Sequence, residues 1–243
     1  MIGVIDLGQY TAARVLAALG FAGLCGIAAI PAQDAQSAAI MSRIDDAAQS
    51  RYQHVLGFTD IEKYAIYRGS DEVHPAASMT VKTTYRKGVG KSYEILSESG
   101  SGLLLRFGLH PLLDNEKEIN IPGNVQKSWF TSANYEMRLK PGVTQRIDGR
   151  DCLAIAMTPR RKAPNTIDGT LWVDAKDGAT AKIEGVASKD PSVFSGTTHM
   201  MRQYSNIDGY AMSQHARAES DGFFGRTVVT IDYSDYHIQL DRQ

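Results

Sequence analysis

Hydrophobic and polar positions follow two different periods along this chain. From Ser37 to Leu56, apolar residues recur every three or four positions, which places them on one face of an α-helix. Farther along they recur at every second position, as at Met79 and Val81 and again at Tyr93 and Ile95. This alternation is typical of strands with one buried face. The pattern predicts one amphipathic helix followed by a mainly β domain.

Turn signals divide the second half of the chain into short strands. Asp-Gly dipeptides tolerate the positive φ angles of tight hairpin turns, and they begin at Asp148, Asp168, Asp177, Asp208 and Asp221. The strand-like segments around these turns are residues 152–157, 170–174, 179–188, 199–205, 210–219 and 225–238. None of the stretches between them is long enough for the helix of a parallel crossover. We therefore predict an antiparallel meander within a single domain.

Residues 114–133 interrupt the alternation. A polar stretch leads to a Pro122-Gly123 turn, and Val125, Trp129 and Phe130 then follow at the spacing of a short helix. We predict that this segment is a helical insertion that crosses the sheet.

The start of the chain holds a long uncharged run. Arg14 precedes mostly apolar residues from Val15 to Ile30, and Pro31 and Ala32 come next. The run is shorter than the roughly 20 residues that a spanning helix needs, so a cleaved signal peptide is favoured over a permanent anchor. We predict a signal peptide of residues 1–32, a single exported domain of residues 33–243, and a periplasmic location. A buried N-terminal helix is the alternative.

Composition narrows the function further. The chain has 26 Lys and Arg against 27 Asp and Glu, a net charge of −1, so no strong positive field favours nucleic acid. Of the two cysteines, Cys25 lies in the leading run and Cys152 in an apolar run, so no internal disulfide is expected in the exported domain. We expect Cys152 to belong to the core rather than to act as a nucleophile.

Motifs for catalysis or cofactor binding are weak. Residues 88–92, Gly-Val-Gly-Lys-Ser, end like a phosphate-binding loop, but Tyr85 stands where that motif needs glycine, which favours a hairpin. His199, His215 and His237 fall on neighbouring predicted strands without the short ligand spacing of metal sites. No Gly-x-Ser-x-Gly elbow occurs. We expect no catalytic residues, no metal and no cofactor, and a hydrolase or metal enzyme remains only the third hypothesis.

Two groups of residues are candidates for binding. Apolar side chains are dense where strand periodicity breaks down, and the candidates for lining a ligand cavity are Leu103, Leu105, Phe107, Trp129 and Phe130. Their alternative role is ordinary core packing. The second group is a basic loop between two prolines that suits an anionic headgroup or a partner protein, with a solvated loop as the alternative: Arg160, Arg161 and Lys162.

Four segments carry a family resemblance: residues 150–152 (Arg-Asp-Cys), 157–162 (Met-Thr-Pro-Arg-Arg-Lys), 168–174 (Asp-Gly-Thr-Leu-Trp-Val-Asp) and 231–236 (Ile-Asp-Tyr-Ser-Asp-Tyr). With the order of elements over residues 37–238, the chain resembles a bacterial branch of the outer-membrane lipoprotein-sorting proteins, the LolA/LolB/RseB-like superfamily. The resemblance implies a strongly curved antiparallel sheet that forms an incomplete barrel. It further implies that an N-terminal helix and a helical insertion close this barrel over a cavity for acyl chains, without catalysis.

The first functional hypothesis is a periplasmic, non-enzymatic carrier or chaperone for lipid or lipoprotein acyl chains. The alternative is an RseB-like sensory module of the envelope that detects lipid or lipoprotein and signals to a protein partner. Both hypotheses include transient membrane contact and exclude nucleic acid as a partner.

Overall fold

The structure is a computed structural model that describes residues 32–163, 165–189, 196–222 and 225–241. Residues 1–31 group apart from residues 32–243, which are described here by themselves. The predicted signal peptide, residues 1–32, lies outside the described residues except for Ala32.

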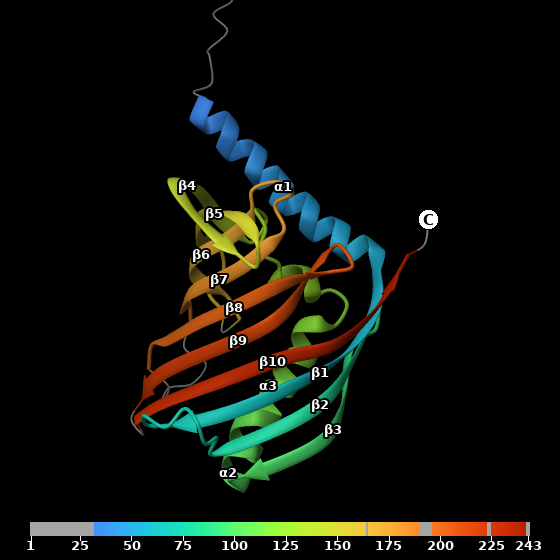
Figure 1. The fold of residues 1–243 in the computed structure, drawn as a ribbon, viewed down its shortest axis with the longest axis vertical. Coiled ribbons are helices and arrows are strands. Elements are labelled where there is room, and N and C mark those ends of the chain that lie inside the picture. The colour runs from blue at the N-terminus through green and yellow to red at the C-terminus, as the bar shows by residue number, and fades with distance from the viewer. Residues whose placement is uncertain (1–31, 164, 190–195, 223–224, 242–243) are drawn as a thin grey trace, which may run out of the picture. The chain divides into compact units, whose positions relative to one another are not determined.

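Ten strands of the described chain form one antiparallel sheet in the order β3-β2-β1-β10-β9-β8-β7-β6-β5-β4 (Figure 1). The strands are β1 Val55–Arg68, β2 Ala77–Arg86, β3 Gly90–Gly100, β4 Tyr135–Ile147, β5 Arg150–Pro159, β6 Ile167–Asp174, β7 Thr180–Ala187, β8 Thr198–Ile207, β9 Tyr210–Gly222 and β10 Gly225–Leu240. The edge strands β3 and β4 do not pair with each other, so the sheet is not closed. This confirms the predicted mainly β class and the antiparallel, incomplete barrel.

The connections follow the chain from β4 to β10, where each strand pairs with the next. Strand β1 then lies between β2 and β10, with Tyr64 opposite Ile231 and Met79. The first strand of the sheet is therefore joined along its length to the last.

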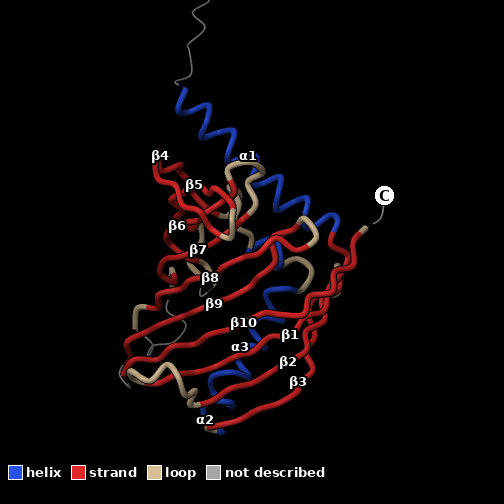
Figure 2. Tube along the Cα trace, in the orientation of Figure 1, coloured by secondary structure: helices blue, strands red, loops and turns tan. Residues whose placement is uncertain are grey.

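Two helical regions cover the sheet. Helix α1 spans Ala32–His54 and ends where β1 begins, so the predicted helix over residues 37–56 is confirmed with an earlier start and end. The insertion consists of α2 Gly102–Leu104, the π-helical turn η1 Leu105–Leu109, α3 His110–Asn120 and the 3₁₀ turn η2 Val125–Ser128. Figure 2 shows α3 lying across one face of the sheet.

The insertion begins 12 residues earlier than predicted, at Gly102 instead of residue 114. The Ser101 side chain accepts a hydrogen bond from the Leu104 backbone N–H at 3.5 Å and starts the first turn there. The leucines after it have no alternation that distinguishes a helix from a strand, which is why periodicity placed the boundary too late.

Each helical region buries its own part of the sheet. Ile40 and Ile44 of α1 pack with the core residues of β4 to β7, including Leu171. Leu109 and Leu113 of the insertion pack against β1 and β2. The insertion therefore covers the end of the sheet that contains β1, β2 and β3, whereas α1 packs on the β4 to β7 end.

The Asp-Gly turn prediction is confirmed at Asp148 and Asp208, whose φ angles are 49° and 52° and whose glycines also have positive φ. It is also consistent with the turn after β6, where Gly178 has φ 76°. Asp221 lies in β9, and the turn after it includes residues outside the described part of the chain.

The prediction was wrong for Asp168, which lies inside β6. Gly169 faces Gly185 across the β6–β7 pair, and a Cβ on Gly169 would lie 2.2 Å from the Glu184 carbonyl oxygen. This glycine serves a close approach of two backbones rather than a turn.

Candidate functional site

The five apolar residues predicted to line a cavity do not form one group. Leu103 and Phe107 lie on the first turns of the insertion with 71% and 69% of their surface exposed. Leu105 is half-buried and packs with the core of β1 and β2. Two of these three residues are therefore on the surface of the insertion and one packs on the apolar interior, and their role in lining a cavity stays a prediction.

Trp129 and Phe130 lie after η2 in a different environment. The Trp129 ring is 5.2 Å from the Tyr52 ring of α1, centroid to centroid. The Phe130 ring is 5.6 Å from that of Tyr135 in β4 and packs on the core beneath α1. The two aromatic residues therefore connect α1 to the rest of the domain, and their role in ligand binding stays a prediction.

The basic loop of residues 160–162 is exposed, but two of its side chains form hydrogen bonds with other parts of the domain. Arg160 donates from Nε to the Ser132 carbonyl at 3.2 Å and lies 3.4 Å from a carboxylate oxygen of Glu136. Arg161 donates to the Lys127 carbonyl at 3.3 Å, whereas the side chain of Lys162 is exposed. Arg161 thus holds the loop against η2 of the insertion and Arg160 holds it against the start of β4, and an anionic partner for the loop stays a prediction.

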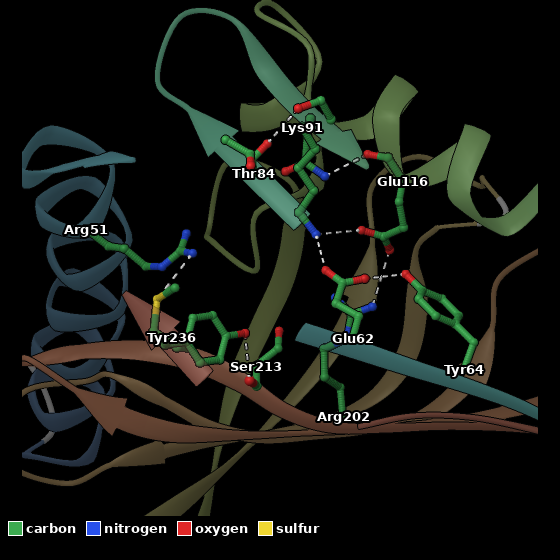
Figure 3. Close-up of polar contacts among 12 residues, drawn as sticks. Arg51, Glu62, Tyr64, Thr84, Lys91, Glu116, Arg202, Ser213 and Tyr236 are labelled. Atoms are coloured by element: carbon green, nitrogen blue, oxygen red, sulfur yellow. Dashed lines mark hydrogen bonds and ion pairs between the residues drawn. The ribbon is translucent and has the colours of Figure 1, made fainter. Parts of the chain in front are cut away.

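A cluster of charged side chains lies between the sheet and α3 (Figure 3). Lys91 of β3 places Nζ 3.4 Å from a carboxylate oxygen of Glu62 in β1 and 3.4 Å from one of Glu116 in α3. Arg202 of β8 lies 3.5 Å from the other Glu116 oxygen. The Tyr64 hydroxyl donates to the second oxygen of Glu62. We call these five residues the buried charge cluster.

Ion pairing fixes the charges in the buried charge cluster. Burial alone would lower the pKa of Lys91, but Glu62 and Glu116 outweigh burial and hold that pKa well above its usual range. Burial would raise the pKa of Glu116, and Lys91 and Arg202 together lower it instead. These charged groups are therefore paired with one another, and their ion pairs hold α3 on the sheet.

Asp60, two residues before Glu62 on the same buried face of β1, is held differently. Burial, followed by repulsion from Glu62, raises the pKa of Asp60 to about 7, although Lys91 and the nearby Tyr236 hydroxyl oppose that shift. Neither carboxylate oxygen of Asp60 has a hydrogen-bond partner among the described residues. Asp60 is thus an acid poised to change protonation near neutral pH.

Buried phenols surround these acids. Burial raises the pKa of Tyr64, Tyr93 and Tyr233 far above the range of neutral solutions. Their hydroxyls therefore stay neutral; the Tyr64 hydroxyl donates to Glu62, whereas those of Tyr93 and Tyr233 can each donate and accept a hydrogen bond. The arrangement offers polar contacts to a ligand inside a mostly apolar interior.

The sequence pattern did not single out Asp60 and Glu62 as functional residues. They alternate with Phe58 and Tyr64 on the buried face of β1, and the predicted alternation began only at Tyr64. Two acids on the apolar face of a strand were the available signal. Lys91 was correctly placed after a hairpin turn, but its role as the partner of two distant acids depends on the tertiary fold.

The remaining candidates for chemistry lie elsewhere. His199 and His237 are exposed, and His215 places Nδ1 2.7 Å from a carboxylate oxygen of Asp232. Within the described ranges, no group of three or more His, Cys, Asp or Glu residues is suited to a metal ion. Cys152 is fully buried, as predicted for a core residue, and burial raises the pKa of its thiol.

Across the part of the chain that the structure describes, no helix is long and apolar enough to cross a membrane.

Comparison with known proteins gives structural similarities only. No protein-family model and no curated protein matches the chain. A DUF1329 family protein from Desulfovibrio piger is 15% identical with a TM-score of 0.43, over 86% of this chain and 95% of that one. A LolA superfamily protein from Nitrosomonas europaea is 14% identical with a TM-score of 0.44, over 85% and 94% of the two chains.

A domain described as an outer membrane lipoprotein-sorting protein, from Vibrio parahaemolyticus, is 12% identical with a TM-score of 0.43, over 84% of this chain and 95% of that one. Because the TM-scores lie below 0.5, the function has to be inferred from this chain's own residues.

Proposed function

We propose that this protein is a non-enzymatic carrier of the periplasm that binds the acyl chains of lipids or lipoproteins. The proposal concerns the face of the open sheet that the insertion covers. A packed second sheet would fill such a face with core, whereas the insertion covers it with short helical turns whose own leucines are in part only half-buried.

The observation that carries the proposal is the graded burial of apolar side chains along the insertion. Leu103 and Phe107 are exposed one helical turn apart, Leu104, Leu105 and Leu112 are half-buried, and Leu109 and Leu113 are buried. An acyl chain that follows this path would leave water step by step, with a gain of about 0.8 kcal/mol per buried methylene. The turn at the start of the path is π-helical, a geometry that is frequent at functional sites.

Uptake of a fluorescent fatty acid tests the proposal. Phe107→Glu should reduce uptake several-fold while the protein still melts cooperatively, because a charge on an exposed residue opposes an acyl chain but not the fold. Leu105→Glu should also weaken uptake. The matched control is Val143→Glu in β4, an exposed apolar position at the other edge of the sheet.

Equal loss of uptake in Val143→Glu would show that any added negative charge has this effect. Absence of acyl-chain binding by the unsubstituted protein would refute the carrier function. Loss of cooperative melting in both Phe107→Glu and Leu105→Glu would assign these residues to the core.

A second candidate is a sensory module that detects lipid and signals to a protein partner. It is favoured by the free edge of β3, where Ile95 and Leu96 are exposed and a partner strand can pair. Leu96→Lys should then reduce crosslinking of a partner to β3 in intact cells without changing fatty-acid uptake. Unchanged crosslinking would exclude the β3 edge as the signalling surface.

A further inference from the structure

Three polar side chains lie side by side on the buried face of the sheet. Asp60 of β1 is directly opposite Thr83 of β2, and Thr83 is directly opposite Tyr93 of β3. Asp60 is 2% exposed and Thr83 is 0% exposed, while Tyr93 is half-buried with its hydroxyl oxygen inside. We call these three residues the polar row.

Within the described residues, no side-chain oxygen of the polar row has a hydrogen-bond partner. This holds for both carboxylate oxygens of Asp60, for Oγ1 of Thr83 and for the Tyr93 hydroxyl. The Tyr236 hydroxyl lies near Asp60, but it donates to the Ser213 carbonyl at 2.8 Å (Figure 3). Unpaired buried oxygens destabilise a fold, so three adjacent residues of this kind indicate a group that binds there.

Local backbone geometry gives Asp60 its position. The β1–β10 register shifts between Thr59, opposite His237, and Ile61, opposite Ser234. Asp235, in the extra stretch of β10, has φ 56°, as expected for a β-bulge. Bulges redirect side chains and occur frequently next to binding sites.

The charge around the polar row favours a cation. Lys91 and Arg202 form their ion pairs with Glu62 and Glu116, and Asp60 has no ion pair among the described residues. Lys117 lies 5.8 Å from the centre of the Tyr93 ring, but it is exposed and pairs with Asp114 at 3.7 Å. Glu62 raises the pKa of Asp60 by more than Lys91 lowers it. A metal ion fits poorly, because two of the three ligands would be neutral hydroxyls.

From this geometry we propose that the polar row binds a primary ammonium group. An ammonium group has three N–H donors, and the row offers three acceptors: a carboxylate and two hydroxyl oxygens. The bond to the carboxylate is charge-assisted and therefore strong.

The polar row also adjoins the apolar path. Tyr93 packs in the same cluster as Leu104, Leu105 and Leu112 of the insertion. An amphiphile could therefore place its amine at the row while its chain follows these leucines. The binding of such an amphiphile rests on the proposed carrier function, and it identifies a primary amine as the headgroup that the carrier prefers.

Calorimetric titration of the full chain with three dodecyl amphiphiles tests the headgroup. The probes are dodecylammonium, dodecyltrimethylammonium, which has the charge but no N–H donor, and dodecanoate. At pH 8 the protein should bind dodecylammonium roughly tenfold more tightly than either of the others, as one charge-assisted hydrogen bond provides. Similar affinity for all three would overturn the ammonium site and leave the carrier function standing.

Isosteric variants locate the site. Asp60→Asn, Thr83→Val and Tyr93→Phe should each reduce the preference for dodecylammonium without changing the affinity for dodecanoate. Glu94→Gln, next to Tyr93 but exposed on the opposite face, should keep the full preference. A full preference in Asp60→Asn would overturn the proposal, and Thr83→Val and Tyr93→Phe provide the same test if that variant fails to fold.

A short amine separates failure of the headgroup site from failure of the carrier function. Ethylammonium, which has no acyl chain, should shift the NMR signals of the Tyr93 ring in the unsubstituted protein and not in Asp60→Asn. If no dodecyl probe binds but this shift occurs, the carrier function fails and the ammonium site stands. If the shift is absent as well, the ammonium site is refuted.

Discussion

Asp60 makes the stability of this protein depend on pH in an unusual direction. In the folded chain its pKa is about 7 against an ordinary value of 3.8, so the folded state binds the proton more tightly than the unfolded state. Between about pH 4 and pH 7 the unfolded state therefore loses its proton first, and the free energy of unfolding falls as pH rises. The full effect is on the order of 4 kcal/mol above pH 7.

The Asp60→Asn variant should remove this pH dependence. We expect its free energy of unfolding to match that of the unsubstituted protein near pH 4, where Asp60 is neutral, and to exceed it at pH 8, where Asp60 is charged and buried. Urea unfolding at several pH values measures both curves. The neighbouring groups that shift the pKa of Asp60 are Glu62, Lys91 and Tyr236, and all three are unchanged in the variant. Equal stability at pH 8 would contradict the raised pKa.

At the scale of the elements, the attachment of helix α3 to the sheet depends on Lys91. Lys91→Met would leave the carboxylates of Glu62 and Glu116 buried without the cation between them, so we expect a loss of about 3 kcal/mol or more. The control is Lys117→Met, which removes an exposed pair with Asp114 and should cost less than about 1 kcal/mol. Chemical unfolding measures both, and similar losses would mean that the cluster does not hold α3.

The close pairing of strands β6 and β7 depends on two facing glycines, Gly169 and Gly185. Gly169→Ala places a methyl group against the Glu184 carbonyl and should destabilise the protein by on the order of 2 kcal/mol. Gly102→Ala meets nothing within 4 Å and serves as the control. Thermal melting of both variants tests this, and an unchanged melting temperature for Gly169→Ala would show that the strands can move apart without cost.

The elements themselves were largely predictable because alternation and turn residues are local signals. The start of the insertion was not, since a leucine run fits a helix and a strand equally well. Asp168 was mistaken for a turn because an Asp-Gly pair does not show whether its glycine needs a positive φ or a close neighbour. At the site, the two acids of β1 were visible in the alternation, but Lys91, which pairs with Glu62, is 29 residues away in the sequence and meets it only through the fold.

For the whole molecule, the leading run predicts export. Residues 1 to about 32 should be absent from mature protein, because the uncharged run suits a signal peptide and is short for a spanning helix. N-terminal sequencing of protein from the periplasmic fraction checks this. Recovery of soluble cytoplasmic protein with an intact Met1 would contradict it.

The pairing of β1 with β10 determines the order in which this protein can fold. The two strands are paired from Val55 with Leu240 to Arg68 with Thr227, so their contacts join parts of the chain that emerge far apart in time. Contacts of such long sequence separation slow folding. Strands β1 to β3 and strands β4 to β9 can form hairpins early, but each set keeps an unpaired edge until β10 arrives. Until β10 is made, β1 and β9 therefore each have an edge that can pair with other strands, and β10 covers both of these edges at once.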